Sequence, residues 1–489
     1  MHTEESSQEM LFGNPVSPGL RRKGMRMRNR FARKYGYTGT DRYPLSAEDN
    51  PVLGFLDVKN IVSGTAGEPI DAERGIVIST IRMGYGHYRI SMALASAAHA
   101  LGFTPYWFDL LAFDTAGARM ISDLERWYSF FSRLSQKSRL FNQLLWDPLL
   151  GKWYKRLEKS YPAMKTSEIV TDIHLDLPPD IAFLGTHPLN AQGAVLAGMR
   201  NVVNVVPDNC PLGFHLADGA VQAVQSPSAY QRFRTLYGMS PKRGPLQSIP
   251  ANLLFMAGHY IDHELAENIE ADCAARLTRI EKRRPRRLLI SIGGAGAQQR
   301  LLMDLVAWLL PRIRGGEVTL YINFGDHRNA WEAFCEGVPG FRDTASLHTD
   351  WTETVALGGQ ALSGDFEGLH AFLHDNPFSA VYATNLFMRP CDILLTKPSE
   401  LAYYPVPKLM LERVGGHEAW GAIRASELGD GTIECAGTEF TKHILDLMLR
   451  EDDLLTMCCE HILNQHRLGV YNGAYRVVEH AMSMKNSHR

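Results

Sequence analysis

Hydrophobic and polar positions form a repeating pattern of strands and helices from residue 75 onward. A β-branched run at 75–81 leads into a glycine-containing loop, and a helical pattern follows at 89–101. The next apolar runs predict four more strands, at 104–109, 180–185, 201–206 and 219–225. Strands that alternate with helices predict a parallel sheet covered on both faces.

The second half of the chain restarts the same pattern. A strand at 288–292 precedes a glycine loop, a helix at 299–310 and a strand at 318–324. Residues 337–378 look irregular and predict an insertion, and the remaining elements are strands at 379–383, 391–396 and 407–411 with a helical tail from 438. We therefore expect an α/β protein with two Rossmann-like domains that face each other across a cleft.

The expected organisation has four parts. They are an N-terminal extension at 1–70, a first Rossmann-like domain at 71–250, a second at 251–437 and C-terminal helices at 438–489. The chain has 489 residues, 45% of them hydrophobic and 21% charged, which is typical of a globular protein. Its net charge of −2 predicts no general attraction to nucleic acid.

The cysteines and the apolar runs indicate the cellular compartment of the protein. The seven cysteines have no C-x-x-C spacing, which favours reduced thiols over a disulfide framework or a zinc site. The first 20 residues lack the apolar core of a signal peptide, and no run of 18 apolar residues exists. We expect a cytoplasmic protein that binds no metal.

Two basic segments leave alternatives open. Residues 21–34 carry eight Lys and Arg side chains, and this arm is either a solvated extension packed on the body or a contact for anionic lipid headgroups. A nucleic-acid arm is a third alternative, disfavoured by the balanced charge elsewhere. Residues 120–160 are helical and rich in aromatic and basic residues. They fit either the core face of ordinary helices or an amphipathic surface in a membrane interface, at the inner face of the membrane.

The first glycine loop is Gly84-Tyr85-Gly86-His87. Open α/β sheets bind ligands at such strand-to-helix turns, and a histidine there can take a proton near neutral pH. The G-x-G-x-x-G fingerprint is partial because Arg89 replaces its third glycine, although Asp109 follows about 20 residues on. Two alternatives remain. His87 could merely cap the helix, and the loop together with Asp109 could belong to a dehydrogenase.

Two further motifs lie in the second half. The loop at 293–296 contains Gly294, Ala295 and Gly296, and it is either a phosphate-binding loop or a plain tight turn. After the strand at 391–396, Lys397 could neutralise phosphate charge and Glu400 could accept hydrogen bonds from ribose hydroxyls. A solvated salt bridge is the alternative for that pair.

These motifs occur in an order that resembles one glycosyltransferase group. It contains the plant and bacterial diacylglycerol glycosyltransferases (monogalactosyldiacylglycerol synthase-like) and the peptidoglycan lipid-intermediate N-acetylglucosaminyltransferase. The matching segments are 75–101, Thr186-His187-Pro188, 205–208, Phe214-His215, 225–227, 289–296, 383–385, 391–398 and 416–419. The resemblance covers roughly residues 75–430 and implies the two-Rossmann (GT-B) fold.

The resemblance implies a metal-independent hexosyltransferase without a cofactor. It would move a sugar from a nucleotide sugar, a UDP-sugar by preference, to an acceptor hydroxyl that could be on a lipid, with inversion. The first domain would bind the acceptor and the second the donor. The implied catalytic residues are His87 and Asp208, and the implied acceptor-binding residues are Gly84, Tyr85, Gly86, His187 and His215. The implied donor-binding residues are Gly294, Ala295, Gly296, Thr384, Asn385, Lys397, Ser399, Glu400, His417 and Glu418.

Two other functions fit the same cleft. A sugar-nucleotide 2-epimerase would need several carboxylates near the sugar but no lipid-binding surface. A non-catalytic nucleotide-sugar-binding protein is the other alternative, because Ser399, His417 and Gly421 replace residues of the group's donor motifs.

Overall fold

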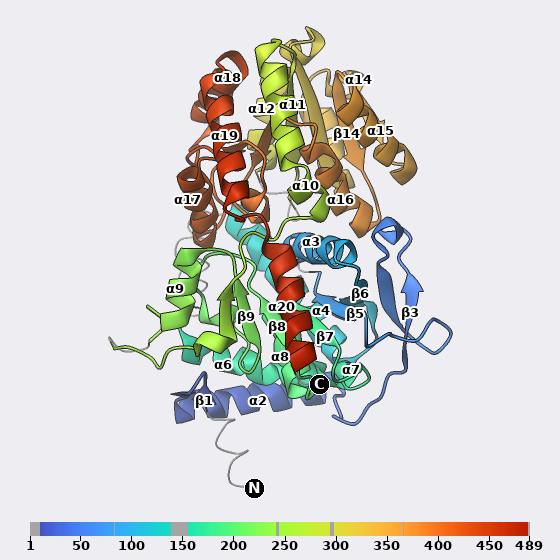
Figure 1. The fold of residues 1–489 in the computed structure, drawn as a ribbon, viewed down its shortest axis with the longest axis vertical. Coiled ribbons are helices and arrows are strands. Elements are labelled where there is room, and N and C mark those ends of the chain that lie inside the picture. Colours follow the sequence, from blue (N-terminus) through green and yellow to red (C-terminus); the bar gives the residue numbers. More distant parts are fainter. Residues whose placement is uncertain are drawn as a thin grey trace. The chain divides into compact units, whose positions relative to one another are not determined.

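The chain folds into two compact α/β units. The structure, a computed structural model, describes residues 10–82, 84–137, 155–240, 244–293, 298–364 and 366–487. The first unit comprises Met1–Asp262 together with Asn472–Arg489, and the second comprises His263–Tyr471. Each unit is built on a twisted sheet with helices on both faces, as Figure 1 shows. Both units are Rossmann-like, as the sequence predicts.

The sheet of the first unit has the strand order β10-β9-β8-β7-β5-β6-β4-β3. All neighbouring pairs are parallel except β3 with β4. The strands are β3 (Leu45–Asp49), β4 (Lys59–Ser63), β5 (Gly75–Thr80), β6 (Thr104–Asp109), β7 (Ala182–Gly185), β8 (Val202–Val205), β9 (Val221–Val224) and β10 (Leu254–Met256). The five strands predicted between residues 75 and 225 are confirmed, whereas β3, β4 and β10 had no clear sequence signal.

The helices of the first unit cover both faces of this sheet. They are α2 (Pro18–Tyr35), α3 (Gly86–Ala100), α4 (Ala116–Lys137), α6 (Leu157–Thr166), α7 (Thr171–His174), α8 (Pro188–Leu196), α9 (Pro227–Thr235) and α20 (Gly473–Ser487). A short hairpin precedes them, formed by β1 (Met10–Leu11) and β2 (Asn14–Pro15). The basic arm is helix α2, whose inner face packs on α6. Of the predicted helical stretch at 120–160, the part at 138–154 lies outside the described residues.

The sheet of the second unit is fully parallel, with the order β13-β14-β12-β11-β15-β16. Its strands are β11 (Arg286–Ser291), β12 (Val318–Gly325), β13 (Ala345–His348), β14 (Leu369–Leu373), β15 (Ile393–Thr396) and β16 (Lys408–Met410). Its helices are α10 (His263–Glu267), α11 (Ile269–Glu281), α12 (Gln299–Arg314), α13 (Arg328–Gly337), α14 (Phe341–Thr344), α15 (Trp351–Ser363), α16 (Pro377–Met388), α17 (Ala419–Leu428), α18 (Thr438–Arg450) and α19 (Asp453–Arg467).

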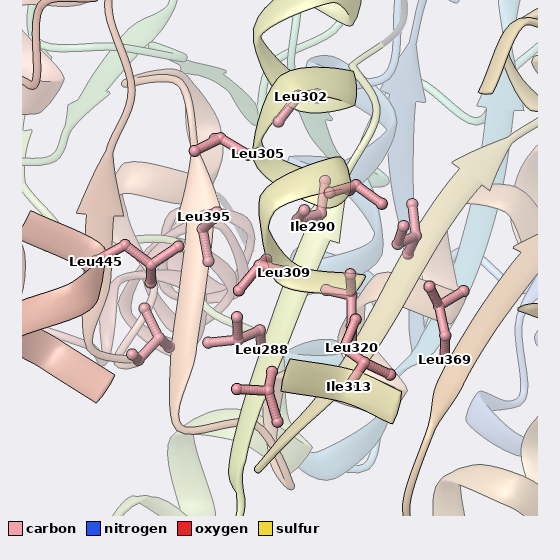
Figure 2. Close-up of a cluster of buried hydrophobic side chains, with 14 of the residues drawn as sticks. Leu288, Ile290, Leu302, Leu305, Leu309, Ile313, Leu320, Leu369, Leu395 and Leu445 are labelled. Carbon is pink, nitrogen blue, oxygen red and sulfur yellow. The ribbon is translucent and has the colours of Figure 1, made fainter. Parts of the chain in front are cut away.

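Alternation along the strands builds the core of the second unit. Leu288 and Ile290 of β11 point to the same side as Leu320 of β12, where Leu305 and Leu309 of α12 cover them. Figure 2 shows this cluster between α12 and the central strands. All five side chains are fully buried. The period of two in the strands and the period near 3.6 in α12 therefore produce one apolar layer.

Two predictions for the second half are wrong. Residues 337–378 are not an irregular insertion, because they contain β13, α15 and β14 of the sheet itself. The expected strand at 379–383 lies inside helix α16. That helix starts at Pro377, and the Asn376 side chain accepts the Phe378 N–H at 2.9 Å. The proline at the first helical position and the Asn cap favour a helix despite the β-branched and aromatic residues that follow.

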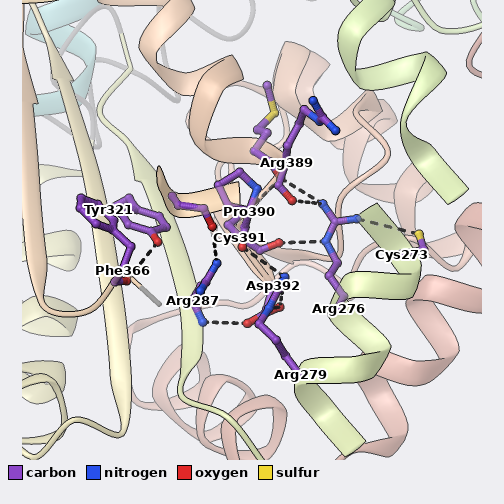
Figure 3. A network of polar contacts seen from close by, with 12 residues as sticks. Cys273, Arg276, Arg279, Arg287, Tyr321, Phe366, Arg389, Pro390, Cys391 and Asp392 are labelled. Atoms are coloured by element: carbon purple, nitrogen blue, oxygen red, sulfur yellow. Dashed lines mark hydrogen bonds and ion pairs between the residues drawn. The ribbon is translucent and has the colours of Figure 1, made fainter. Parts of the chain in front are cut away.

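Buried arginines tie α11 and β11 to the amino end of β15 (Figure 3). The Arg276 guanidinium donates to the carbonyl oxygens of Cys391 at 2.8 Å and Met388 at 3.0 Å. Arg279 donates to the Asp392 carboxylate at 2.9 Å, and the Arg287 backbone N–H donates to the same carboxylate at 2.8 Å. The Arg276 bonds satisfy carbonyls at the end of α16 and just beyond it. The Arg287 guanidinium of β11 donates to the carbonyl oxygens of Ala361 at 2.6 Å and Gly364 at 2.7 Å, so this charged side chain also has partners.

No helix in the described part of the chain is long and apolar enough to cross a membrane.

Candidate functional site

The predicted motifs of the first unit lie where its sheet changes direction. Strand β5 is central, and the chain continues to β6 on one side before it returns to β7 on the other. The loops that follow β5 and β7 therefore diverge at the carboxyl ends of two adjacent strands. Ligands of open α/β sheets bind at such a topological switch point.

His87 joins these two loops. It is in the first turn of α3, and its Nδ1 lies 2.7 Å from the carbonyl oxygen of Thr186, just after β7. Because a carbonyl oxygen can only accept, Nδ1 carries the proton of this hydrogen bond. The lone pair of the neutral imidazole is then on Nε2. A histidine in this tautomer can accept a proton through Nε2.

The backbone before His87 needs its glycine. Gly84 has φ +84°, a left-handed conformation that residues with a Cβ rarely adopt. This conformation turns the chain between β5 and α3. Tyr85 and Gly86 complete the turn and are half-buried. Gly84, Tyr85 and Gly86 thus shape the loop around His87, and their predicted role in acceptor binding stays a prediction.

A buried polar network holds the Thr186 carbonyl in place. The Thr186 hydroxyl donates to the Ser79 carbonyl at 3.2 Å and lies 3.1 Å from the Ser91 hydroxyl. The Asn190 amide donates to the Ser79 hydroxyl at 2.6 Å. All four residues are fully buried. Two strands and two helices are therefore linked directly beneath His87.

His187 follows Thr186 and caps helix α8. Its Nδ1 accepts the Leu189 N–H at 3.2 Å, and its ring centroid lies 5.1 Å from that of His87. Burial lowers the pKa of His187 well below its usual value, and His87 and His215 lower this pKa further. The ring is therefore a neutral imidazole beside His87.

Asp208 and His215 form the third part of this site. Asp208 follows β8, and its Oδ1 accepts the Cys210 N–H at 2.7 Å. The same oxygen is 3.9 Å from His215 Nδ1, which is too far for a hydrogen bond. Burial lowers the pKa of His215 to about 4, so this side chain is also neutral at pH 7. The predicted catalytic role of Asp208 and acceptor role of His215 stay predictions.

Asp109, on which the dehydrogenase alternative depends, is engaged by the protein. Its Oδ1 accepts the Leu111 N–H at 2.9 Å, and its Oδ2 accepts the Tyr88 hydroxyl. Burial raises the pKa of this carboxyl group. Both carboxylate oxygens thus have protein partners, which disfavours binding of a ribose there.

The motifs of the second unit lie at its own switch point. Strand β11 has β12 on one side and β15 on the other, so the loops after β11 and β15 leave the sheet next to each other. A Cβ on Gly293 would lie 3.5 Å from Cε of Lys397, which shows how close the two loops come. Gly294, Ala295 and Gly296 lie outside the described residues.

Lys397 and Glu418 form an ion pair at this edge. The Lys397 ammonium donates to Glu418 Oε1, while Glu418 Oε2 accepts the N–H groups of Val414 at 2.7 Å and Gly415 at 3.2 Å. Burial alone would raise the pKa of Glu418, but Lys397 and the Val414 N–H lower it below its usual value. Glu418 is therefore an ionised carboxylate that positions the Lys397 cation.

The other predicted donor residues divide into buried and accessible groups. Thr384 is fully buried, with its hydroxyl 3.2 Å from that of Ser291 and accepting the Asn323 amide at 2.7 Å. Asn385 is buried beside it in α16. The half-buried side chains are those of Ser399, Glu400 and His417, at the carboxyl ends of β15 and β16. These placements leave their predicted roles in donor binding untested.

Sequence reasoning missed the polar residues behind both switch points. Ser79, Ser91 and Asn190 stand in apolar segments, as does Asn323 in β12. A polar residue within an otherwise buried run was the available signal, because such a group must find a partner inside the protein. Within the described ranges, no group of three His, Cys, Asp or Glu side chains could hold a metal ion.

Two family models match the chain, one in each half, and the second also covers residues 249–262 and 472–482 of the first structural unit. Residues 10–235 match the family model described as Domain of unknown function (DUF6937), and residues 249–482 match that described as Domain of unknown function (DUF6938). No curated protein matches the chain.

Similar solved structures are distant. One is an α,α-trehalose 6-phosphate synthase of Burkholderia multivorans, with 12% identity and a TM-score of 0.41 over 85% of this chain and all of that chain. Another is described as trehalose-6-phosphate from E. coli bound with UDP-2-fluoro glucose, with 12% identity and a TM-score of 0.39 over 84% and 99% of the chains. The spinosyn rhamnosyltransferase SpnG with thymidine diphosphate has 16% identity and a TM-score of 0.28 over 84% and 96%.

Proposed function

We propose that this protein is a glycosyltransferase of the GT-B type. It transfers a sugar from a nucleotide sugar, preferentially a UDP-sugar, to a hydroxyl group of an acceptor, with inversion and without a metal ion. The observation that carries this proposal is the His87–Thr186 hydrogen bond, because it sets the tautomer in which the lone pair of the neutral imidazole is on Nε2, at the switch point of the first unit. An acceptor hydroxyl must lose a proton as it attacks the sugar.

The second unit supplies the donor side of the proposal. Lys397 is held at the switch point by ionised Glu418, next to the loop that starts at Gly293. A fixed cation and backbone N–H groups can stabilise the negative charge that develops on a departing diphosphate. This arrangement is the reason for proposing chemistry that needs no metal ion.

The acceptor is proposed to be a lipid at an anionic membrane surface. The support is helix α2, which has eight basic residues and no acidic residue in its first turn. Several of the basic residues are on the exposed face of the helix. The protein would then be cytoplasmic and bind peripherally to the inner face of the membrane.

The test compares two variants of His87 with the parent protein. His87→Asn keeps an N–H group that can donate to the Thr186 carbonyl but has no group in the place of Nε2, whereas His87→Ala removes both. Purified protein is incubated with a panel of nucleotide sugars with and without membrane lipid extract, and products are measured by mass spectrometry. We expect extract-dependent transfer by the parent and a loss of about 10²–10⁴-fold in both variants, because the positioned base is lost.

Donor binding by calorimetry is the control, and it should be unchanged in both variants. Equal transfer by His87→Asn and the parent would remove His87 from the mechanism. Epimerisation of the sugar without extract would support the epimerase instead, and binding without turnover would support a nucleotide-sugar-binding protein.

A further inference from the structure

His187 lies next to His87, the proposed base. The Nδ1 atom of His187 accepts a hydrogen bond, whereas the Nδ1–H of His87 donates one. The backbone N–H of Leu189 donates to His187 Nδ1 at 3.2 Å. Because an amide N–H can only donate, Nδ1 must carry the lone pair, and the proton of the neutral ring is on Nε2. The first turn of α8 therefore fixes the tautomer of His187.

His87 is fixed in the complementary tautomer. Its Nδ1 donates to the Thr186 carbonyl at 2.7 Å, which leaves the lone pair on Nε2. The Thr186 carbonyl and the Leu189 N–H, three residues apart in the chain, thus set the two neutral rings in opposite tautomers. The Nε2 of His87 can accept a hydrogen bond, and the Nε2–H of His187 can donate one.

The rings of His87 and His187 are direct neighbours. Their centroids are 5.1 Å apart and their planes are inclined at 67°, so one small ligand can contact both rings. A hydroxyl oxygen can give its proton to one partner and accept a proton from the other, whereas a carboxylate or phosphate can only accept.

We propose that His187 is a neutral hydrogen-bond donor which, together with His87, selects an alcohol as the acceptor. This inference rests on the proposed function for its kinetic consequences. As the hydroxyl proton moves to His87, negative charge develops on the oxygen, and the Nε2–H of His187 stabilises that charge. The ring stays neutral because it is buried and because His87 and His215 oppose a positive charge there.

Two variants separate donation from helix capping. His187→Asn keeps a side-chain oxygen that can accept the Leu189 N–H, since Asn is among the best capping residues, but it lacks the Nε2–H. His187→Gln can place an amide N–H near the position of Nε2 but loses the cap. We expect His187→Asn to retain the parent's melting temperature and to lose about 100-fold in kcat/KM for transfer. His187→Gln should melt at a lower temperature yet recover about tenfold of that loss.

A spectroscopic readout tests the tautomers without relying on transfer. Nitrogen-15 NMR of imidazole-labelled full-length protein should show His187 protonated at Nε2 and not at Nδ1, with no titration between pH 5 and 8. It should show His87 in the opposite tautomer when neutral. If this pattern is found and no nucleotide sugar is turned over, the proposed function fails while the donor–acceptor pair stands.

Three results would overturn the inference. They are a proton on His187 Nδ1, titration of His187 within this pH range, and parent-like kcat/KM in a stably folded His187→Asn variant. Activity lost equally in the Asn and Gln variants would also contradict it, because the N–H group that Gln places near the position of Nε2 would then have restored nothing.

Discussion

Backbone groups in this protein fix the tautomers of two histidine side chains and help to keep one glutamate ionised. The Thr186 carbonyl fixes His87, and the Leu189 N–H fixes His187. Glu418 is kept ionised by Lys397 and two backbone N–H groups, against the effect of burial. In each case the backbone groups belong to the segment that directly follows a strand, β7 for the two histidines and β16 for Glu418.

Asp172 is a buried carboxyl group without such support. It is 2% exposed, and neither of its carboxylate oxygens has a hydrogen-bond partner among the described residues. Burial raises its pKa to about 6, and Asp41 and Asp176 act in the same direction, against Arg42. The folded protein therefore holds a proton that the unfolded chain releases near pH 4.

This raised pKa predicts how stability depends on pH. The contribution of Asp172 is fully present below about pH 4 and is lost as the pH rises through about 6, because the native state then has to bury a charge. Asp172→Asn should raise the free energy of unfolding by roughly 1–2 kcal/mol at pH 7.5 and change it little at pH 4.

Thermal unfolding of the full-length chain between pH 4 and 8 measures this difference. Asp180→Asn is the control at an exposed carboxyl group, which pairs with Arg200 at 3.4 Å. Because exposed ion pairs contribute little to stability, this variant should shift the midpoint little at any pH in this range. A pH-independent effect of Asp172→Asn would mean that Asp172 is ionised throughout.

At the level of individual residues, the sequence predicted which motifs approach the switch points but not what lies behind them. Position after a strand was enough to bring the loops of His87 and His187 together, because parallel strands end at one edge of a sheet. The hydrogen bonds of Ser79, Ser91 and Asn190 come from elements about 100 residues apart in sequence, and no local pattern specifies such pairings.

Among the elements, helix α2 was predicted either to pack on the body of the protein or to contact anionic lipid, and its packing bears on both alternatives. Its buried side contains Gly24 and Ala32, and Arg28 on that side pairs with Glu168 at 2.9 Å. An amphipathic helix that lies in a membrane buries its apolar face in lipid. Here that face is occupied by α6, so membrane contact through α2 would be electrostatic, without insertion.

The outer side of α2 carries an arginine stripe, which we define as Arg22, Arg26 and Arg33. Their spacing of four and seven residues places them on one face, and all three are exposed. Each cation near an anionic surface contributes about 1 kcal/mol, so the triple variant Arg22→Gln, Arg26→Gln, Arg33→Gln should bind vesicles about 100-fold more weakly.

Co-sedimentation with vesicles of phosphatidylserine and phosphatidylcholine measures this binding. The control variant removes three exposed charges elsewhere, at Lys282, Arg283 and Arg284, and should bind like the parent. Binding by the parent should also weaken as salt is added. Equal binding by the two triple variants would assign the arginine stripe a role in solubility only.

Element prediction failed where capping competes with residue preference. Residues 379–383 have the composition of a strand, yet Asn376 and Pro377 begin a helix there. Strands β13 and β14 were missed because serine and histidine interrupt their apolar residues, and pairing with neighbours in the sheet stabilises them. Strands β5, β6 and β12 were predicted correctly because β-branched and aromatic residues predominate in them.

At the scale of the whole molecule, the last helix belongs to the first unit. Helix α20 (Gly473–Ser487) packs on α3, which ends at Ala100, and on β7, which ends at Gly185, so both partners are distant from it in sequence. The Gly473 N–H donates to the His259 carbonyl at 2.9 Å, and the Lys485 ammonium donates to the Glu73 carbonyl. Hydrophobic periodicity predicts that α20 is a helix but contains no information about which unit it joins.

This arrangement predicts that damage to the C-terminus destabilises the N-terminal part of the chain. Val478 is fully buried within the first unit, whereas its neighbour Glu479 is exposed. Val478→Asp would bury an unpaired charge, which costs several kcal/mol, and Glu479→Gln is the matched control. Hydrogen exchange should show lost protection in α3 and β7 of the Val478→Asp variant and parent-like protection in β11 and β12. The opposite pattern, with β11 and β12 affected and β7 protected, would place α20 with the second unit.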